Sequence, residues 1–408
     1  MEEEFLGFVI TGHVDHGKST LIGRILYDTN SLQEGRIEEV RKTCEMLGRQ
    51  MEFAYVIDHL REERENEMTI DTAQTFFRWG NRDYAIIDAP GHKEFMKNMI
   101  TGASLADAAV LIIDVAEGMR EQTQRHAYAL GMLGLEQVIV VINKMDKVGH
   151  KKENFEKVKA EAAKFLLRLK IKPSHFIPIA ALHGENVVKR SENMPWYDGP
   201  VLLEALKGFK PRKSLKMRPL RFPVQDVYDF EGKKIAVGRV ESGVLAAGEM
   251  VALPSGKKII VKGLEGFPKA PKNAEAGINS GFFEDIGLKR GDVVCAGKLP
   301  HYGKKLEGSV FWLGIEPLKK GEKILCRIAT QEAEGTVEKI SKRMNSSTLE
   351  IIENDATKLE GTEAAEVLLS FSKPLVSDLF GEIPTMGRFV LARHGIVEGG
   401  GIITKAVE

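Results

Sequence analysis

Short, almost continuously apolar runs alternate with amphipathic stretches in the first half of the chain. Such runs are typical of strands buried on both faces, and their alternation with helical patterns predicts a mostly parallel sheet covered by helices. The predicted strands are Phe5–Thr11, Tyr84–Asp88, Val110–Asp114, Val138–Asn143 and Phe176–Ala180. The predicted helices are Lys18–Tyr27, Glu121–Leu133 and Glu153–Leu169.

Two local signals refine this α/β pattern. Gly80-Asn81 lies between Gln74–Trp79 and Arg82–Asp88 and predicts a two-residue hairpin, which adds one antiparallel edge strand. Ser31 followed by Glu34 has the spacing of a capping box, so we expect another helix to begin there.

The second half of the chain is dominated by β-type runs and tight turns. It follows a basic, proline-bounded stretch, Lys210 to Pro219, which is typical of a hinge. Many short strands at regular spacing predict two small β-barrels that divide near residues 299–303. The predicted strands are Arg221–Val227, Ile235–Val240, Met250–Pro254 and Lys258–Val261, then Gly308–Leu313, Lys323–Ile328, Glu334–Ile340, Ala365–Leu369 and Arg388–Ala392. We therefore expect an α/β domain over 1–210 and β-barrels over 211–300 and 301–408.

Composition limits the class of protein. The 408 residues carry 58 basic and 58 acidic side chains. The strongly basic net charge of many nucleic-acid-binding proteins is therefore excluded, although a local basic patch is not. Cys44, Cys295 and Cys326 form no CxxC pair, which favours idle thiols in a reducing compartment. The acidic start and the lack of a long apolar run predict a cytoplasmic protein with no membrane span.

The first chemical motif is a phosphate loop. Gly12-xxxx-Gly17-Lys18-Ser19 follows an apolar run and precedes a predicted helix, the context in which backbone N–H groups surround a β-phosphate. Lys18 is predicted to bridge the β- and γ-phosphates, and the Ser19 hydroxyl to bind Mg²⁺. The remaining predicted contacts are His13, Val14, Asp15, His16, Gly17 and Thr20. A zinc site at the two histidines is disfavoured, because no further Cys/His cluster accompanies them.

Three later residues complete a predicted phosphate and magnesium site. Asp88 ends a predicted strand, where its carboxylate would hold Mg²⁺ through a water. Gly91 offers a backbone N–H near a γ-phosphate and would move when that phosphate is lost. Thr69 is the candidate second hydroxyl on Mg²⁺.

A fourth motif predicts which base is bound. In Asn143-Lys144-Met-Asp146 the Asp146 carboxylate would accept hydrogen bonds from N1–H and the 2-amino group of guanine, which adenine does not offer in that arrangement. Asn143 and Lys144 would brace the ring. A second loop, Ala180-Ala181-Leu182, would contribute a backbone N–H from Ala181. Together the motifs predict a Mg²⁺-dependent guanine-nucleotide switch that binds GTP and GDP.

With these motifs in order, the chain resembles the translation-factor GTPases, the elongation factor Tu and elongation factor 1-alpha superfamily. The resemblance is carried by Gly12-His-Val-Asp-His-Gly-Lys-Ser-Thr20, Asp88-Ala-Pro-Gly-His92 and Lys97-Asn-Met-Ile-Thr-Gly-Ala103. It implies an α/β P-loop GTPase domain followed by two small β-barrels. It also implies that His92 positions the attacking water, so the expected catalytic residues are His92, Lys18 and Gly91.

Within this superfamily, further strings look like the large GTPase subunit of ATP-sulfate adenylyltransferase. They are Thr69-Ile-Asp-Thr-Ala73, Pro195-Trp-Tyr-Asp-Gly-Pro200, Arg221-Phe-Pro-Val-Gln225 and Val251-Ala-Leu-Pro-Ser-Gly-Lys257. This resemblance implies that GTP hydrolysis drives synthesis of adenosine 5′-phosphosulfate by a small catalytic partner subunit, which holds ATP and sulfate. It is the interpretation we favour from sequence.

The alternative is an elongation factor that delivers aminoacyl-tRNA to the ribosome. Two strings look equally like elongation factor 1-alpha: Gln225-Asp-Val-Tyr228 and Val237-Gly-Arg-Val-Glu-Ser-Gly243. A regulatory GTPase with another partner is a third possibility.

Two departures from the superfamily pattern stand out. Glu67 and Met68 replace Gly and Ile beside Thr69, with Val14 and Met68 expected to form an apolar gate near His92. Ala180 replaces a serine.

Overall fold

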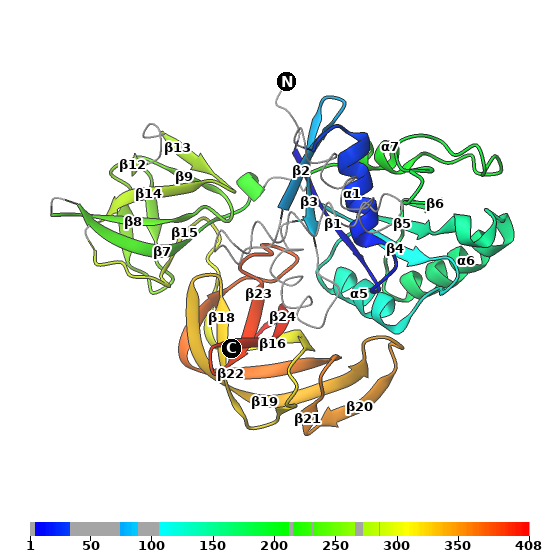
Figure 1. Cartoon of the computed structure of the whole chain (residues 1–408). Coiled ribbons are helices and arrows are strands. Elements are labelled where there is room, and N and C mark those ends of the chain that lie inside the picture. Colours follow the sequence, from blue (N-terminus) through cyan, green and yellow to red (C-terminus); the bar gives the residue numbers. More distant parts are fainter. Residues whose placement is uncertain are drawn as a thin grey trace, which may run out of the picture. The chain divides into compact units, whose positions relative to one another are not determined.

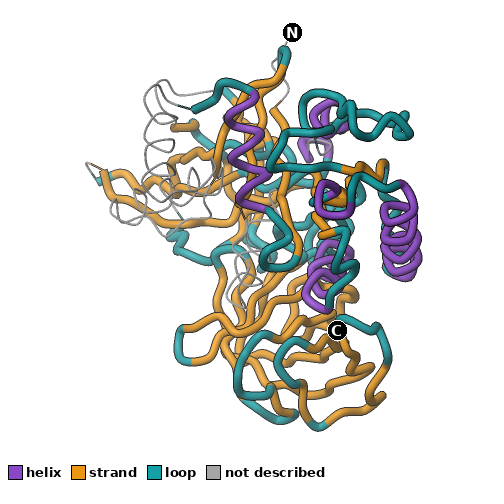
Figure 2. Tube along the Cα trace, turned by 45° about the vertical axis from the view of Figure 1, so that its right-hand side comes forward, coloured by secondary structure: helices purple, strands orange, loops and turns teal. Residues whose placement is uncertain are grey.

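The computed structural model of the chain describes residues 5–32, 74–88, 106–211, 215–230, 232–265, 272–284 and 286–407. The chain folds into two compact units, Met1–Arg212 and Lys213–Glu408. Helices gather around the sheet of the first unit, whereas the second is built from strands and loops (Figure 2). Among the described helices, none is long and apolar enough to cross a membrane.

The first unit contains a six-stranded sheet in the order β2-β3-β1-β4-β5-β6 (Figure 1). Its strands are β1 (Phe5–Gly12), β2 (Gln74–Trp79), β3 (Arg82–Asp88), β4 (Ala108–Asp114), β5 (Val138–Asn143) and β6 (His175–Pro178). All neighbouring pairs are parallel except β2–β3, which is the predicted antiparallel hairpin. Gly80 between them has φ +61°, a conformation that favours glycine. The predicted sheet is thus confirmed.

Helices cover both faces of this sheet. They are α1 (Lys18–Asp28), α5 (Glu121–Met132), α6 (Lys152–Arg168) and α7 (Leu202–Lys207), with a short 3₁₀ turn, η2 (Met145–Val148), after β5. α1 and α7 share one apolar core with β1 residues such as Phe8. The intervening strand positions, Val9 among them, are buried as well, and α5 and α6 contact β1, β4 and β5. Burial on both faces explains why the strands are continuously apolar.

The second unit contains two seven-stranded sheets with separate apolar cores. The first has the order β11-β10-β15-β7-β8-β14-β12, and the second β18-β23-β24-β16-β22-β19-β20; a β18–β19 pairing closes the second sheet into a barrel. A 3₁₀ turn, η3 (Leu215–Met217), precedes them. The strands of the first part are β7 (Leu220–Phe230), β8 (Lys233–Arg239), β9 (Val244–Ala246), β10 (Met250–Ala252), β11 (Lys258–Ile260), β12 (Leu264–Glu265), β13 (Asn273–Glu275), β14 (Asn279–Glu284) and β15 (Val293–Ala296). Those of the second are β16 (His301–Trp312), β17 (Leu318–Lys319), β18 (Lys323–Ile328), β19 (Gln331–Asn345), β20 (Ile351–Ala356), β21 (Lys358–Leu359), β22 (Glu363–Ser377), β23 (Arg388–Arg393) and β24 (Ile396–Val407).

A buried ion pair joins the two sheets of this unit. The Arg221 guanidinium on β7 donates two hydrogen bonds to the Asp378 carboxylate, at 2.8 and 2.9 Å. Both side chains are almost inaccessible. A small apolar cluster that includes Cys295 and Met386 lies across the same two parts. The boundaries at 210 and 300 remain our proposal; the separate cores support a division near 300.

The structure also differs from the predicted elements. Several strands are longer than expected, and the strands not predicted are β9, β12, β13, β14, β15, β17, β20, β21 and the longest of them, β24. Its glycines resemble turn residues, but they allow close approach, since a Cβ on Gly399 would lie 2.6 Å from the Trp312 ring and one on Gly401 2.5 Å from the Ser309 carbonyl oxygen. Cys295 and Cys326 are buried free thiols, as expected. The helix predicted after Ser31, and Cys44, lie outside the described residues.

Candidate nucleotide-binding site

The phosphate loop connects β1 to α1, as its sequence context predicted. Gly17 has φ +95°, and a Cβ there would lie 2.5 Å from Nδ2 of Asn143. A Cβ on Gly12 would lie 2.3 Å from the carbonyl oxygen of Ile112. Both positions therefore require glycine. Gly17 is also the N-cap of α1, and a glycine has no side chain that could cap the first-turn N–H groups, which attract anions at a helix N-terminus.

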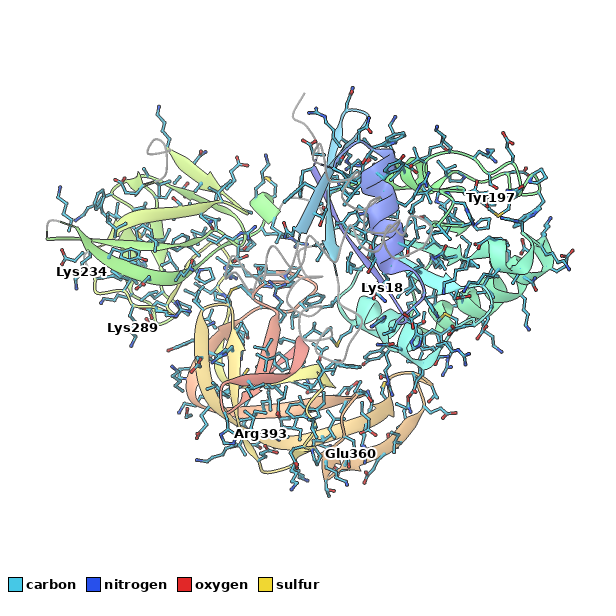
Figure 3. The ribbon with its side chains drawn as sticks, in the orientation of Figure 1. Lys18, Tyr197, Lys234, Lys289, Glu360 and Arg393 are labelled. Atoms are coloured by element: carbon cyan, nitrogen blue, oxygen red, sulfur yellow. The ribbon has the colours of Figure 1, made fainter. Side chains whose placement is uncertain are left out.

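Lys18, Ser19 and Thr20 form the first turn of α1. Lys18 is labelled in Figure 3. The Lys18 ammonium folds back over the loop and donates to the carbonyl oxygens of Gly12, at 2.9 Å, and His13, at 2.7 Å. This places a positive charge inside the glycine-bounded loop. The loop therefore fits a phosphate group in its shape, its charge and its N–H donors.

His13 and His16 belong to the fold of the loop. The His16 ring is fully buried, with Nδ1 3.3 Å from the carbonyl oxygen of Ile112 and Nε2 3.6 Å from a carboxylate oxygen of Glu117. Burial lowers the pKa of His16 below its usual range. His13 stacks edge-on against His16, with ring centroids 5.1 Å apart.

A third histidine near the loop, His126 on α5, was not among the predicted site residues. It is 1% exposed, and burial, followed by the nearby Lys18 charge, lowers its pKa to about 3; a hydrogen bond to the backbone of Gly12 opposes that shift. A polar residue on the apolar face of the predicted helix was the available signal. His126 is thus a neutral, buried neighbour of the phosphate loop.

Asn143 links the phosphate loop to the second loop. Its Nδ2 donates to the carbonyl oxygen of His16 at 2.9 Å, and its Oδ1 accepts a hydrogen bond from the Ala181 N–H at 3.0 Å. The side chain is 2% exposed. The N–H expected to reach guanine is thus engaged with Asn143 in this structure, and Ala180 and Ala181 are themselves buried.

Lys144 lies across the same site. Its ammonium donates to the carbonyl oxygen of Asp15 and pairs with the Asp114 carboxylate at 2.7 Å. Asp114, at the end of β4, was also missed. Burial alone would raise its pKa, but the hydrogen bonds from Lys144 and from the Ala116 N–H outweigh it and hold the pKa below its ordinary value.

Asp146 lies in η2, one turn after Asn143. Its carboxylate is partly exposed, and Nε2 of His183 lies 3.9 Å from it. Leu182 is an exposed apolar residue beside it in sequence, 38% accessible. The structure therefore brings together Gly12 to Thr20, Asn143, Lys144, Asp146 and Ala180 to Leu182, all of which lie at the carboxyl ends of parallel strands or just beyond them. Ligands bind at this edge in open α/β sheets.

The remaining predicted residues are not placed. Thr69, Gly91 and His92 lie outside the described residues, as do Glu67 and Met68, and only the backbone of Asp88 is described, at the end of β3. Of the expected Mg²⁺ ligands, Ser19 alone has a described side chain, at a position consistent with that role. The predicted magnesium set and the gate formed by Val14 and Met68 stay predictions.

Comparison with known proteins gives the family. Residues 3–212 match the family model described as elongation factor Tu GTP binding domain, and residues 305–404 match GTP-eEF1A C-terminal domain-like. The chain is 38% identical to elongation factor 1-alpha of Archaeoglobus fulgidus, 39% to that of Pyrococcus furiosus and 40% to that of Thermoplasma acidophilum. These matches cover 97–98% of this chain and 96–98% of the relatives.

These relatives overturn the favoured sulfate-activation interpretation: the subunit of ATP-sulfate adenylyltransferase, its small catalytic partner and the transferase activity were all wrong. The structure gives the physical reason. Arg221 to Gln225 lie in β7, where Phe222 and Val224 are core residues, and Val251 to Lys257 form β10 and a turn. In Pro195 to Pro200, the Tyr197 hydroxyl donates to the Pro200 carbonyl oxygen.

These three strings therefore reflect strand packing and turn geometry, which different members of a superfamily share, and they do not identify the partner. The fourth string, Thr69 to Ala73, lies outside the described residues. The two elements of the resemblance that do hold are the phosphate loop with its guanine motifs and the α/β domain followed by β-barrels. The chain belongs to the translation-factor GTPases of the elongation factor Tu and elongation factor 1-alpha family.

Proposed function

We propose that this protein is an elongation factor 1-alpha-like GTPase that binds GTP and GDP with Mg²⁺ and delivers aminoacyl-tRNA to the ribosome. One observation carries the nucleotide part of the proposal. Asn143 is hydrogen-bonded to both the phosphate loop and the loop at Ala181, so the phosphate-binding and base-reading elements form one unit. The tRNA part rests on relatives that are called elongation factor 1-alpha along almost the whole chain.

Different residues would bind the phosphates, the guanine base and the magnesium ion. Lys18 and the first-turn N–H groups of α1 would hold the β- and γ-phosphates, and Asp146 would accept hydrogen bonds from N1–H and the 2-amino group of guanine. Ser19, Thr69 and Asp88 would hold Mg²⁺, which neutralises phosphate charge when bound. Lys144 would lie along the base and, through Asp114, keep its orientation.

Hydrolysis would depend on residues after Asp88. His92 would orient the attacking water. The backbone N–H of Gly91 would bind the γ-phosphate, and Gly91 would move when that phosphate is lost. Glu67 and Met68 stand where glycine and isoleucine are usual. Because glycine supplies backbone freedom, we expect the conformational change on hydrolysis to differ in rate from that of the relatives.

Protection of the aminoacyl ester tests this function. The parent protein is loaded with a non-hydrolysable GTP analogue or with GDP, and spontaneous deacylation of aminoacyl-tRNA is followed. We expect protection with the GTP analogue and little with GDP. The control is Asp146→Asn, which should lose protection with the GTP analogue and regain it with the xanthine analogue. Equal deacylation rates in both nucleotide states of the parent would reject delivery of aminoacyl-tRNA.

A further inference from the structure

The loop that carries Ala180 and Ala181 is held from a second side by Glu185. The Glu185 backbone pairs with Ala180 in both directions: the Ala180 N–H donates to the Glu185 carbonyl oxygen at 3.3 Å, and the Glu185 N–H donates to the Ala180 carbonyl oxygen at 3.2 Å. Any displacement of Glu185 is therefore transmitted to Ala180. This connection is independent of the bond between Asn143 and Ala181.

The Glu185 side chain reaches the other base-reading loop. One carboxylate oxygen lies 2.7 Å from Nε2 of His150, and the second accepts a hydrogen bond from Nδ2 of Asn193. The side chains of Glu185 and His150 are 13% and 20% exposed, so the contact is largely shielded from water. A shielded, charge-assisted hydrogen bond contributes more than an exposed ion pair.

His150 is fixed to the turn that carries Asp146. The His150 N–H donates to the carbonyl oxygen of Met145 at 2.8 Å, and Nε1 of Trp196 donates to the carbonyl oxygen of His150 at 2.9 Å. The residue before it, Gly149, donates to the carbonyl oxygen of Asp146. The backbone of His150 is thus anchored at the end of η2, and Tyr197, next to Trp196, marks this region in Figure 3.

Glu185 and His150 together connect the turn of Asp146 with the loop of Ala181. The superfamily serine expected at position 180 is an alanine here, so the residue at that position has no hydroxyl with which to brace its neighbours. The 2.7 Å contact supplies a connection between the same two loops. A fixed distance between them is needed if Asp146 and the second loop are to meet one guanine ring together.

We propose that Glu185 and His150 form a positioning pair that sets the guanine selectivity and the dwell time of the bound nucleotide. This inference rests on the proposed binding of GTP and GDP. Neither residue touches the nucleotide in this account; both act through Asp146 and the Ala180–Leu182 loop. Breaking the pair should allow the two loops to separate, which weakens recognition of the 2-amino group first.

The test measures dissociation of fluorescent GDP and of fluorescent IDP, which lacks the 2-amino group, from the full-length protein. The variants are Glu185→Ala, His150→Asn and the double variant. Asn is chosen because His150 has φ +57°, a conformation that Asn tolerates better than most residues. Glu156→Gln is the matched control, since it breaks an exposed pair with Lys159 on α6.

We expect each single variant to release GDP roughly tenfold faster, the effect of losing one charge-assisted hydrogen bond, and to release IDP with a much smaller change. The double variant should be no faster than the faster single variant, because the two residues act as one unit. Glu185→Gln keeps an acceptor oxygen and should recover part of the dwell time. The control should match the parent.

Equal acceleration of GDP and IDP release would overturn the proposal, because a merely structural loss would affect both nucleotides alike. Unchanged GDP release in both single variants would overturn it as well. GDP binding by the parent protein is measured before any variant is tested. If the parent does not bind GDP, the proposed function is rejected together with this inference.

Discussion

Asn143 donates a hydrogen bond to the carbonyl oxygen of His16, 2.9 Å away and 127 positions earlier in the chain. Its other amide atom accepts the Ala181 N–H. A single buried side chain therefore connects the phosphate loop with the Ala180–Leu182 loop, which we propose reads the base.

Asn143→Ala should weaken GDP binding. The substitution leaves the carbonyl of His16 and the N–H of Ala181 without this partner, and such losses amount to about 2–3 kcal/mol together, or roughly 30- to 150-fold in affinity. Equilibrium titration with fluorescent GDP measures the effect. Asn143→Asp keeps an acceptor for Ala181 but places an oxygen against the His16 carbonyl, so it should be no better. An affinity within twofold of the parent would contradict the bridging role.

Gly17→Ala should impair nucleotide binding by displacing Asn143. The new Cβ would combine a strained φ of +95° with a 2.5 Å approach to Nδ2 of Asn143. Gly80 provides a matched control in the same unit, because its φ is +61° and a Cβ there meets no atom within 4 Å. Gly80→Ala should cost about 1 kcal/mol of stability through backbone strain and leave GDP affinity nearly unchanged, whereas Gly17→Ala should lose at least about tenfold in affinity. Equal losses in the two variants would show that backbone strain alone is responsible.

The fold was predictable where one physical rule dominated. The buried strands of the first unit, such as Val138–Asn143, follow directly from their continuous apolar character. β24 was not predicted, because glycine has a low strand propensity, whereas the close approach of Trp312 and Phe389 to Gly399 and Gly401 favours glycine at these positions. Tertiary contacts of this kind leave no periodic signal in the sequence.

The site was predictable as far as its motifs extend. Lys18, Asn143 and Lys144 occupy positions that the motif spacing indicated. Asp114 and His126 support these residues from β4 and α5, but Asp114 ends an otherwise apolar strand and His126 lies on the buried face of a helix, and their partners are set by the packing of these elements. The choice of partner protein failed for a related reason: strings such as Arg221 to Gln225 encode barrel packing.

Acid should destabilise the protein through His126. In the unfolded chain its pKa is about 6.5, whereas burial lowers the folded pKa to about 3. Between these values the unfolded state binds a proton that the folded state does not, so the free energy of unfolding should fall as the pH decreases below about 6.5, by up to about 1.4 kcal/mol per pH unit. His16, whose pKa is also lowered, adds in the same direction.

Urea unfolding between about pH 7 and pH 5 measures this slope. His126→Gln removes the titrating group while keeping a polar side chain, and should flatten the dependence without abolishing it, because His16 remains. Identical slopes in the parent and the variant would exclude His126 as a source of the acid sensitivity.

Breaking the Arg221–Asp378 pair should destabilise the second unit. Asp378→Asn leaves the Arg221 guanidinium buried without a compensating charge, which costs about 3–5 kcal/mol. Arg327→Gln is the control, because its pair with Glu332 is exposed and should contribute less than about 1 kcal/mol. Thermal unfolding of both variants compares the loss of stability at the buried pair with that at the exposed pair. A loss in Asp378→Asn no larger than that in the control would mean that the buried pair does not stabilise the unit.

Base recognition by Asp146 is the most direct test of the guanine-nucleotide site. Equilibrium binding of GTP and XTP is measured for the parent and for Asp146→Asn, with Asp198→Asn, an exposed carboxylate in the same unit, as the control. We predict that the parent prefers GTP, and that Asp146→Asn loses at least about tenfold in GTP affinity and gains affinity for XTP, because the asparagine amide matches the 2-oxo group of xanthine. Unchanged GTP affinity in Asp146→Asn would contradict the account.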